Sequence, residues 1–178
     1  MLKEKIKNIK KIGVLGGTFD PPHIGHLNIS IIALKRLKLN KLIWVVAKKN
    51  PLKKNPYLST NMRIKLSKNI TKSNKKIFVK YLDHKVKSSY TFKVLNYLKK
   101  NNKKNKLFFL IGADNLINLH KWKKWQKITK IAKIVIFARA SHSNKLLDST
   151  ALKKLEKNQW MYLNEKKVNI SSSLIRNF

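Results

Sequence analysis

The segment GGTFDPPHIGH, residues 16–26, combines residue types suited to holding a phosphate chain. Gly16 and Gly17 follow a short apolar run, and glycine lets main-chain N–H groups come close to an anion. His23 and His26 stand three residues apart at the start of a predicted helix, so both can face a triphosphate, with room left by Gly25. Separately, these could be turn and surface residues. The whole string predicts a nucleotide phosphate site.

A second anion-binding pattern lies near the other end, in ISSSLIR at residues 170–176. Ser171, Ser172 and Ser173 offer hydroxyl and main-chain donors at a possible helix start, and Arg176 can bind phosphate with two parallel hydrogen bonds. A serine cap explains this string equally well when it is taken alone. Its combination with the first segment favours phosphate binding.

The elements that must position these residues follow from apolar runs alternating with amphipathic stretches. Strands are predicted at 12–15, 42–47, 77–81, 107–111, 134–138 and 160–163, and helices at 24–37, 60–70, 90–100, 114–119, 123–131 and 144–158. This order predicts an α/β fold with a parallel sheet of five or six strands flanked by helices, in a single domain, 1–178.

Ligands of such sheets bind beyond the carboxyl ends of the strands, near the switch in strand order. Segments 16–26, 48–53, 112–125 and 139–142 are expected there. Asp114, after a strand-ending glycine, can accept hydrogen bonds from ribose hydroxyls, cap the next helix, or do both.

Charge is the strongest compositional feature, with 42 basic residues against 7 acidic ones, a net charge of +35. Only four of the basic residues are arginine, and lysine spread along the chain with asparagine and isoleucine is typical of an A+T-rich genome. We therefore explain the positive charge by the composition of the genome and not by a nucleic-acid partner. The absence of cysteine, of a membrane span and of a secretory signal predicts a cytoplasmic protein with no membrane partner.

The first segment matches the H-x-G-H motif of the nucleotidylyltransferase superfamily, and its full length is similar to nicotinate-nucleotide adenylyltransferases. SYT at 89–91, IGAD at 111–114 and ISSSLIR resemble later motifs of that family in order and spacing. The resemblance spans residues 12–176; members of the family continue about a helix further, whereas this chain ends at Phe178.

The resemblance implies a Rossmann-like nucleotidylyltransferase fold and transfer of AMP from ATP to nicotinate mononucleotide, giving deamido-NAD and pyrophosphate. Mg²⁺ is expected mainly on the ATP phosphates, with no metal site built by the protein. The implied catalytic residues are His23, His26 and Arg176; the ATP-binding residues are Gly16, Gly17, Thr18, Phe19, Gly25, Ile111, Gly112, Asp114, Arg139, Ser171, Ser172 and Ser173; the nicotinate mononucleotide-binding residues are Lys53, Tyr90, Thr91 and Trp122.

Several roles on the pyridine side stay open. Trp122 can stack on the pyridine ring or pack in the core, and Thr91 can bind the pyridine carboxylate or cap a helix. Lys53 competes with neighbouring lysines for the substrate phosphate. Arg36 and Arg63 are interpreted as helix-surface residues.

Other functions fit parts of the pattern. Within the superfamily, the alternatives are a pantetheine-phosphate or a nicotinamide-nucleotide adenylyltransferase. The string HIGH at 23–26 also occurs in class I aminoacyl-tRNA synthetases, but the chain is far too short for one. A basic nucleic-acid-binding module would explain the charge and leave both phosphate motifs unexplained.

Overall fold

Near-continuous apolar runs form the strands of one buried parallel sheet, as expected when helices cover both faces. The computed structural model describes residues 9–137, 148–163 and 175. The strands are β1 (Lys11–Gly17), β2 (Lys41–Val46), β3 (Ile77–Lys80), β4 (Lys106–Gly112), β5 (Lys133–Phe137) and β6 (Trp160–Leu163). Their order is β3-β2-β1-β4-β5-β6, and every neighbouring pair is parallel. The predicted sheet is confirmed.

Helices connect the strands. They are α1 (Ile24–Arg36), α2 (Thr60–Thr71), α3 (Asp83–Val86), α4 (Thr91–Lys100), α5 (Ala113–Ile117), α6 (Trp125–Ile131) and α8 (Thr150–Lys153), with a 3₁₀ turn, η1, at Leu119–Lys121. Ser59 caps α2 by accepting a hydrogen bond from the main-chain N–H of Met62. None of the helices in the described part of the chain has the length and hydropathy that crossing a bilayer requires.

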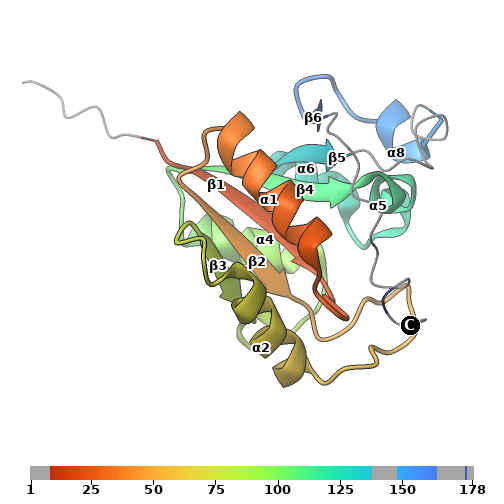
Figure 1. The fold of residues 1–178 in the computed structure, drawn as a ribbon. Coiled ribbons are helices and arrows are strands. Elements are labelled where there is room, and N and C mark those ends of the chain that lie inside the picture. Colours follow the sequence, from red (N-terminus) through yellow and green to blue (C-terminus); the bar gives the residue numbers. More distant parts are fainter. Residues whose placement is uncertain (1–8, 138–147, 164–174, 176–178) are drawn as a thin grey trace, which may run out of the picture.

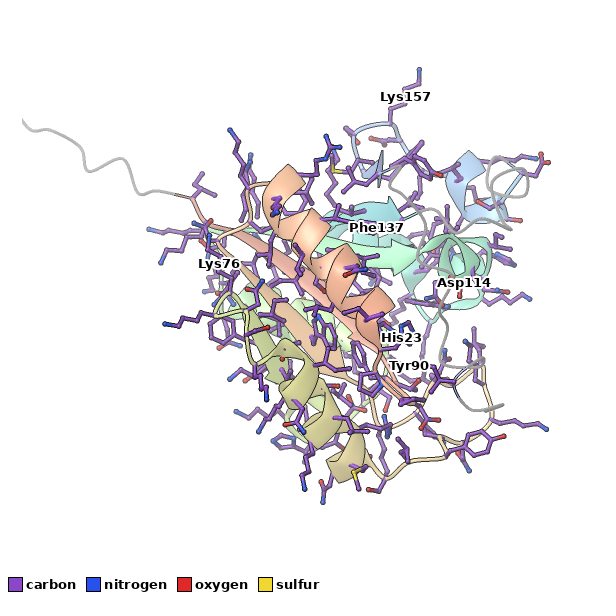
Figure 2. The ribbon with its side chains drawn as sticks, in the orientation of Figure 1. His23, Lys76, Tyr90, Asp114, Phe137 and Lys157 are labelled. Carbon is purple, nitrogen blue, oxygen red and sulfur yellow. The ribbon has the colours of Figure 1, made fainter. Side chains whose placement is uncertain are left out.

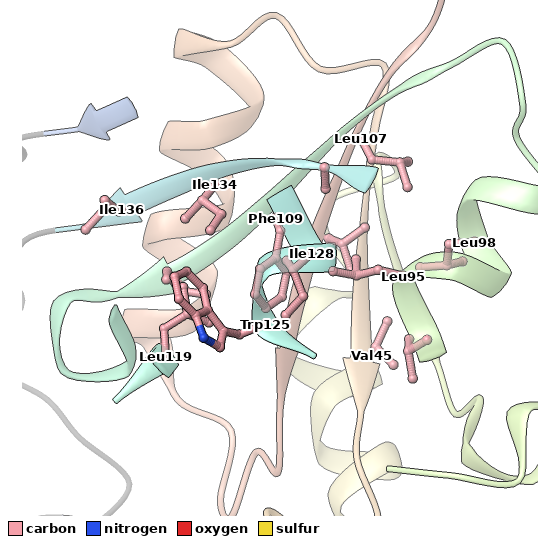
Figure 3. Packing of buried hydrophobic residues seen from close by; sticks show 14 of the residues in the cluster. Val45, Leu95, Leu98, Leu107, Phe109, Leu119, Trp125, Ile128, Ile134 and Ile136 are labelled. Carbon is pink, nitrogen blue, oxygen red and sulfur yellow. The ribbon is translucent and has the colours of Figure 1, made fainter. Parts of the chain in front are cut away.

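The core consists of two apolar clusters, one on each face of the sheet, because successive strand residues point to opposite faces. Ile12 and Val14 of β1 belong to the cluster that α4 and α6 cover, and Leu15 belongs to the cluster under α1. Figure 1 shows α1 and α2 on one side of the sheet and α4 behind it. Figure 3 shows how Leu95, Phe109 and their neighbours fill the α4–α6 side.

The strand order changes direction between β1 and β4, because the chain runs outward through β2 and β3 and then returns to the other side of β1. Crossovers on opposite sides of this point leave a crevice at the carboxyl ends of β1 and β4. The first phosphate-binding segment and the IGAD segment begin in the last residues of these two strands. The sheet therefore brings them together.

Three local expectations differ from the structure. The predicted helix at 144–158 is helical, among its described residues, only over Thr150–Lys153, because Lys154 ends it and a turn follows. The short helix α3 was not predicted, because a single turn leaves no periodic pattern in the sequence. Gly16 and Gly17 are strand residues paired with Val45 and Val46, and not turn residues.

Candidate active site

A cavity of about 750 Å³ lies at the carboxyl end of the sheet, within the range usual for small-molecule sites. The predicted residues that line it are Gly16, Gly17, Thr18, Phe19, Gly25, His23, His26, Lys53, Tyr90, Thr91, Ile111, Gly112, Asp114 and Trp122. In Figure 2, His23, Tyr90 and Asp114 lie toward this end of the molecule, away from Lys76. Five other predicted residues, Arg139, Ser171, Ser172, Ser173 and Arg176, fall outside the described residues.

The two glycines at the end of β1 are not required by the folded chain itself. Neither has a positive φ. A Cβ atom added at Gly16 would lie 3.6 Å from the Phe109 ring, and one added at Gly17 would lie 3.6 Å from the Phe19 ring, both ordinary contacts. Their lack of a side chain therefore leaves main chain accessible at the cavity.

Phe19 has a left-handed main chain, with φ 51°, which is uncommon for a bulky residue. Its ring stacks on Trp44 of β2, with the ring centroids 4.8 Å apart and the planes inclined by 9°, and the side chain is 2% exposed. Such backbone strain persists only where the surroundings enforce it, and it is concentrated at functional sites. The buried ring thus fixes the turn that follows Thr18.

His23 and His26 meet at the first turn of α1. His23 is the N-cap residue and is buried, and the two imidazole centroids lie 3.8 Å apart. The Nδ1 atom of His26 accepts a hydrogen bond of 3.2 Å from the main-chain N–H of His23. A neutral His26 ring therefore carries its proton on Nε2, which leaves Nε2–H as its donor.

A buried polar chain supports the His26 main chain. The Ser30 hydroxyl donates to the carbonyl oxygen of His26 at 2.7 Å and accepts from the Trp44 Nε1–H at 2.8 Å. The His26 ring also lies 4.9 Å from the Phe19 ring, centroid to centroid. The Trp44 side chain thus contacts both the strained turn and the helix that carries the histidines.

On the other side of the cavity, Trp122 is half-buried and meets the Phe109 ring edge-on, with the centroids 6.2 Å apart. Trp125, three residues on, is 6% exposed and belongs to the core. Tyr90 is the N-cap residue of α4 and makes no capping hydrogen bond through its side chain. The capping alternative for Thr91 is therefore wrong, because Thr91 is already the first helical residue.

Asp114 lies in the first turn of α5, where a carboxylate is favoured by the helix dipole. The N-cap residue is Gly112, so the proposed N-cap role of Asp114 is wrong. The Asp114 side chain lines the cavity.

The surface interpretation of Arg63 is also wrong. Arg63 is 1% exposed, because the loop between β2 and α2 folds back over the first turn of the helix. Arg36 is exposed, as predicted. Burial lowers the pKa of the Arg63 guanidinium, and the charges of Asp20, Tyr81 and Asp83 oppose this lowering.

Asp20 and Asp83 hold the stems of the same loop. The two carboxylate oxygens of Asp20 accept from the main-chain N–H groups of Tyr57 at 2.8 Å and Leu58 at 2.9 Å. Asp83 accepts from the main-chain N–H of Lys48 at 2.8 Å and from the Ser89 hydroxyl. One available signal was that Arg63 is one of only four arginines among 42 basic residues.

Carboxylates that already serve main-chain donors are poorly placed to form a metal site. Among the residues that the structure describes, no group of three or more His, Cys, Asp or Glu could hold a metal ion. Both oxygens of Asp20 accept main-chain hydrogen bonds, and so does Oδ2 of Asp83. Within the described ranges, Asp20 and Asp83 therefore do not fit the role of magnesium ligands.

Comparisons with known proteins agree with this geometry. The family model for cytidylyltransferase-like proteins matches residues 14–178. Proteins named probable nicotinate-nucleotide adenylyltransferase are similar to the chain: that of Pelagibacter ubique (strain HTCC1062) is 46% identical over 93% of this chain and 92% of its own length, and that of Clostridium novyi (strain NT) is 33% identical over 95% and 86%.

A similar fold occurs in the solved structure of Plasmodium falciparum nicotinic acid mononucleotide adenylyltransferase complexed with NaAD. Its TM-score is 0.79 at 22% identity, over 95% of this chain and 83% of that one.

Proposed function

Because the chain belongs to the cytidylyltransferase-like family and, within it, to the nicotinate-nucleotide adenylyltransferases, we propose that its cavity joins ATP to nicotinate mononucleotide. The chain is a nucleotidyltransferase: it transfers AMP, giving nicotinate adenine dinucleotide and pyrophosphate. The observation that carries this proposal is a single cavity lined by the Gly16–His26 segment on one side and by Thr91 and Trp122 on the other.

In the transfer, a phosphate oxygen of nicotinate mononucleotide attacks the α-phosphorus of ATP. The new P–O bond forms as the bond to the β-phosphate oxygen breaks, and pyrophosphate leaves. No protein nucleophile is required, so the chain acts by positioning the substrates and stabilising charge. The Nε2–H donor of His26, fixed by the hydrogen bond at Nδ1, would bind the charge that develops on the α-phosphate.

The remaining ATP contacts are assigned by position. At the end of β1, main-chain groups of Gly16, Gly17 and Thr18 are available to the ATP phosphates. His23 offers a second imidazole, and Asp114 offers a carboxylate to the ribose hydroxyls. The roles of Arg139, Ser171–Ser173 and Arg176 stay predictions that rest on the family motif.

On the pyridine side, Trp122 offers a face on which the ring can stack, and Thr91 offers a hydroxyl to the pyridine carboxylate. Lys53 lies on the exposed loop after β2, and its ammonium group is assigned to the substrate phosphate. Tyr90 lines the cavity beside Lys123, whose ammonium lies 4.9 Å from its ring centroid.

Mg²⁺ would enter as a substrate component, bound to the phosphates of ATP. The ion prefers several water and phosphate ligands and needs few from protein. The expected cytoplasmic location stays a prediction.

The test is pyrophosphate release from ATP with one acceptor at a time: nicotinate mononucleotide, nicotinamide mononucleotide, pantetheine phosphate, or none. We expect release only with a pyridine mononucleotide, and the higher kcat/KM with the nicotinate form. A higher kcat/KM with nicotinamide mononucleotide or pantetheine phosphate would overturn the substrate assignment and keep the reaction class.

A further inference from the structure

Arg63 has a complete set of hydrogen-bond partners in the interior. A guanidinium has five N–H donors in a rigid plane, and in this protein all five find acceptors. The acceptors are the main-chain oxygens of Leu58 (Nε, 3.0 Å), Thr18 (Nη1, 2.6 Å), Ala47 (Nη1, 2.7 Å) and Lys48 (Nη2, 2.9 Å) and the hydroxyl of Thr60 (Nη2, 3.0 Å).

These acceptors come from both halves of the site. We call the segment 16–26 the ATP half of the site and the loop 48–58 the acceptor half. Thr18 follows β1 and belongs to the ATP half. Ala47, Lys48 and Leu58 are the two stems of the loop after β2, which carries Lys53. Arg63 itself is not among the residues that line the cavity, so it acts on the substrates only through these segments.

Two carboxylates also hold the stems of this loop by hydrogen bonds. Asp20 holds the stem that enters α2, and Asp83 holds the stem that leaves β2. Through Ser89, Asp83 also joins the loop to the segment that contains Thr91. Asp20 belongs to the same segment as Thr18, and the Gly17 carbonyl accepts from the Ala47 N–H at 2.9 Å, so the ATP half also bonds each stem separately. Arg63 differs in that one side chain bonds Thr18 and both stems of the loop together.

We propose that Arg63 is a positioning residue: its one buried guanidinium, bonded to Thr18 and to both stems of the loop 48–58, holds the ATP half of the site and the acceptor half at the separation that the reaction needs. This inference rests on the proposed function for its kinetic consequence. The role of Arg63 concerns how the two substrates are placed relative to each other. The contacts that bind ATP lie in the ATP half, and those that bind the acceptor phosphate lie on the loop, so binding of each substrate alone should change little.

The placement has a distinct kinetic signature. In-line attack depends on the distance and angle between the acceptor oxygen and the α-phosphorus, and small misplacement costs rate more than binding. Loss of the guanidinium should therefore lower kcat. The KM for each substrate should change much less.

Arg63→Lys is the first test, because lysine keeps the charge and has three donors in place of five. We expect kcat to fall about tenfold or more, and each KM to change less than about threefold, at a temperature where the variant is fully folded. Arg36→Lys, on the exposed face of α1, is the matched control and should leave both parameters at wild-type values.

A second test needs no activity. Hydrogen exchange of the main-chain amides of Lys48, Tyr57 and Leu58 reports the loop stems, and amides of the β4 strand report the sheet. In Arg63→Ala, we expect faster exchange at the stems with the sheet still protected. Millimolar methylguanidinium, but not sodium at the same ionic strength, should restore the protection of the stem amides.

A kcat within twofold of wild type in folded Arg63→Lys, or stem exchange unchanged in Arg63→Ala, would overturn the proposal. So would a loss of protection spread evenly over the sheet, since that marks Arg63 as a general stability residue. If the wild-type protein fails to use any pyridine mononucleotide, the proposed function fails, and the exchange experiment still decides the role of Arg63.

Discussion

The two ends of the sheet are both hollow and both basic, yet only one is built as a site. Lys49, Lys53, Lys54, Lys121 and Lys123 line the cavity at the carboxyl end. A second hollow of about 730 Å³, at the amino ends of β1, β4 and β5, is lined by Lys11, Arg36, Lys38, Lys99, Lys106, Lys130 and Lys133. By positive charge alone, the amino end would be the better anion site.

The difference lies in what accompanies the charge. Three of the chain's seven acidic residues, Asp20, Asp83 and Asp114, line the carboxyl-end cavity together with His23 and His26. The described residues that line the amino-end hollow include neither an acid nor a histidine. In a chain so rich in lysine, the rare residue types locate the site, and the lysines do not.

The largest effect that tests this contrast is expected from His26→Ala. Loss of a donor to the transition-state charge should lower kcat by about 100-fold or more. Pyrophosphate release measures the rate, and thermal unfolding checks the fold.

Two controls accompany that variant. His26→Gln keeps a side-chain acceptor at the third helical position and so separates the helix cap from the chemistry. Lys106→Ala, at the exposed amino end, should leave kcat unchanged. A kcat for His26→Ala within threefold of wild type would remove His26 from the mechanism.

A smaller effect is expected from Trp122→Ala. Loss of a stacking face should raise the KM for nicotinate mononucleotide about tenfold, because stacking on an aromatic ring contributes about 1–3 kcal/mol. Steady-state kinetics with saturating ATP measures this KM.

Trp125→Ala is the matched variant, because Trp125 is buried in the core. It should lower the free energy of unfolding by about 3–5 kcal/mol, with little change in KM at temperatures where it is folded. If the two tryptophans exchanged these phenotypes, the assignment of Trp122 to the substrate would be wrong.

The smallest effect is expected at the amino end. The double variant Lys106→Glu, Lys130→Glu should keep kcat/KM within about twofold of wild type at 0.15 M salt, where charges are screened beyond about 8 Å. Lys53→Glu, on the loop at the other end, should lower kcat/KM about tenfold through electrostatic repulsion of the substrate phosphate. Equal losses at both ends would mean that overall charge, and not the local site, governs binding.

The sheet and the first site segment could be predicted because their signals are contiguous in the sequence. Buried parallel strands are unbroken apolar runs, and residues 16–26 contain glycines and histidines within a single string. Arg63 could not be placed, because its partners are carbonyl oxygens, which every residue has, and one of them lies 45 positions away. The sequence shows that Arg63 carries hydrogen-bond donors, but only the fold shows which acceptors they bind.

The loop after β2 has a thermodynamic consequence. Figure 1 shows it running out from the end of β2 and returning to the start of α2, and its stems at Lys48 and Leu58 are held by hydrogen bonds to Asp83, Asp20 and Arg63. Ordering a free loop around a ligand costs conformational entropy, about 0.5–1.5 kcal/mol for each immobilised side chain of the longer types. Here that cost is confined to the mostly exposed stretch 49–56, since folding has already ordered the stems. Less of the binding energy of the acceptor phosphate is therefore used to order the loop, and more of it contributes to affinity.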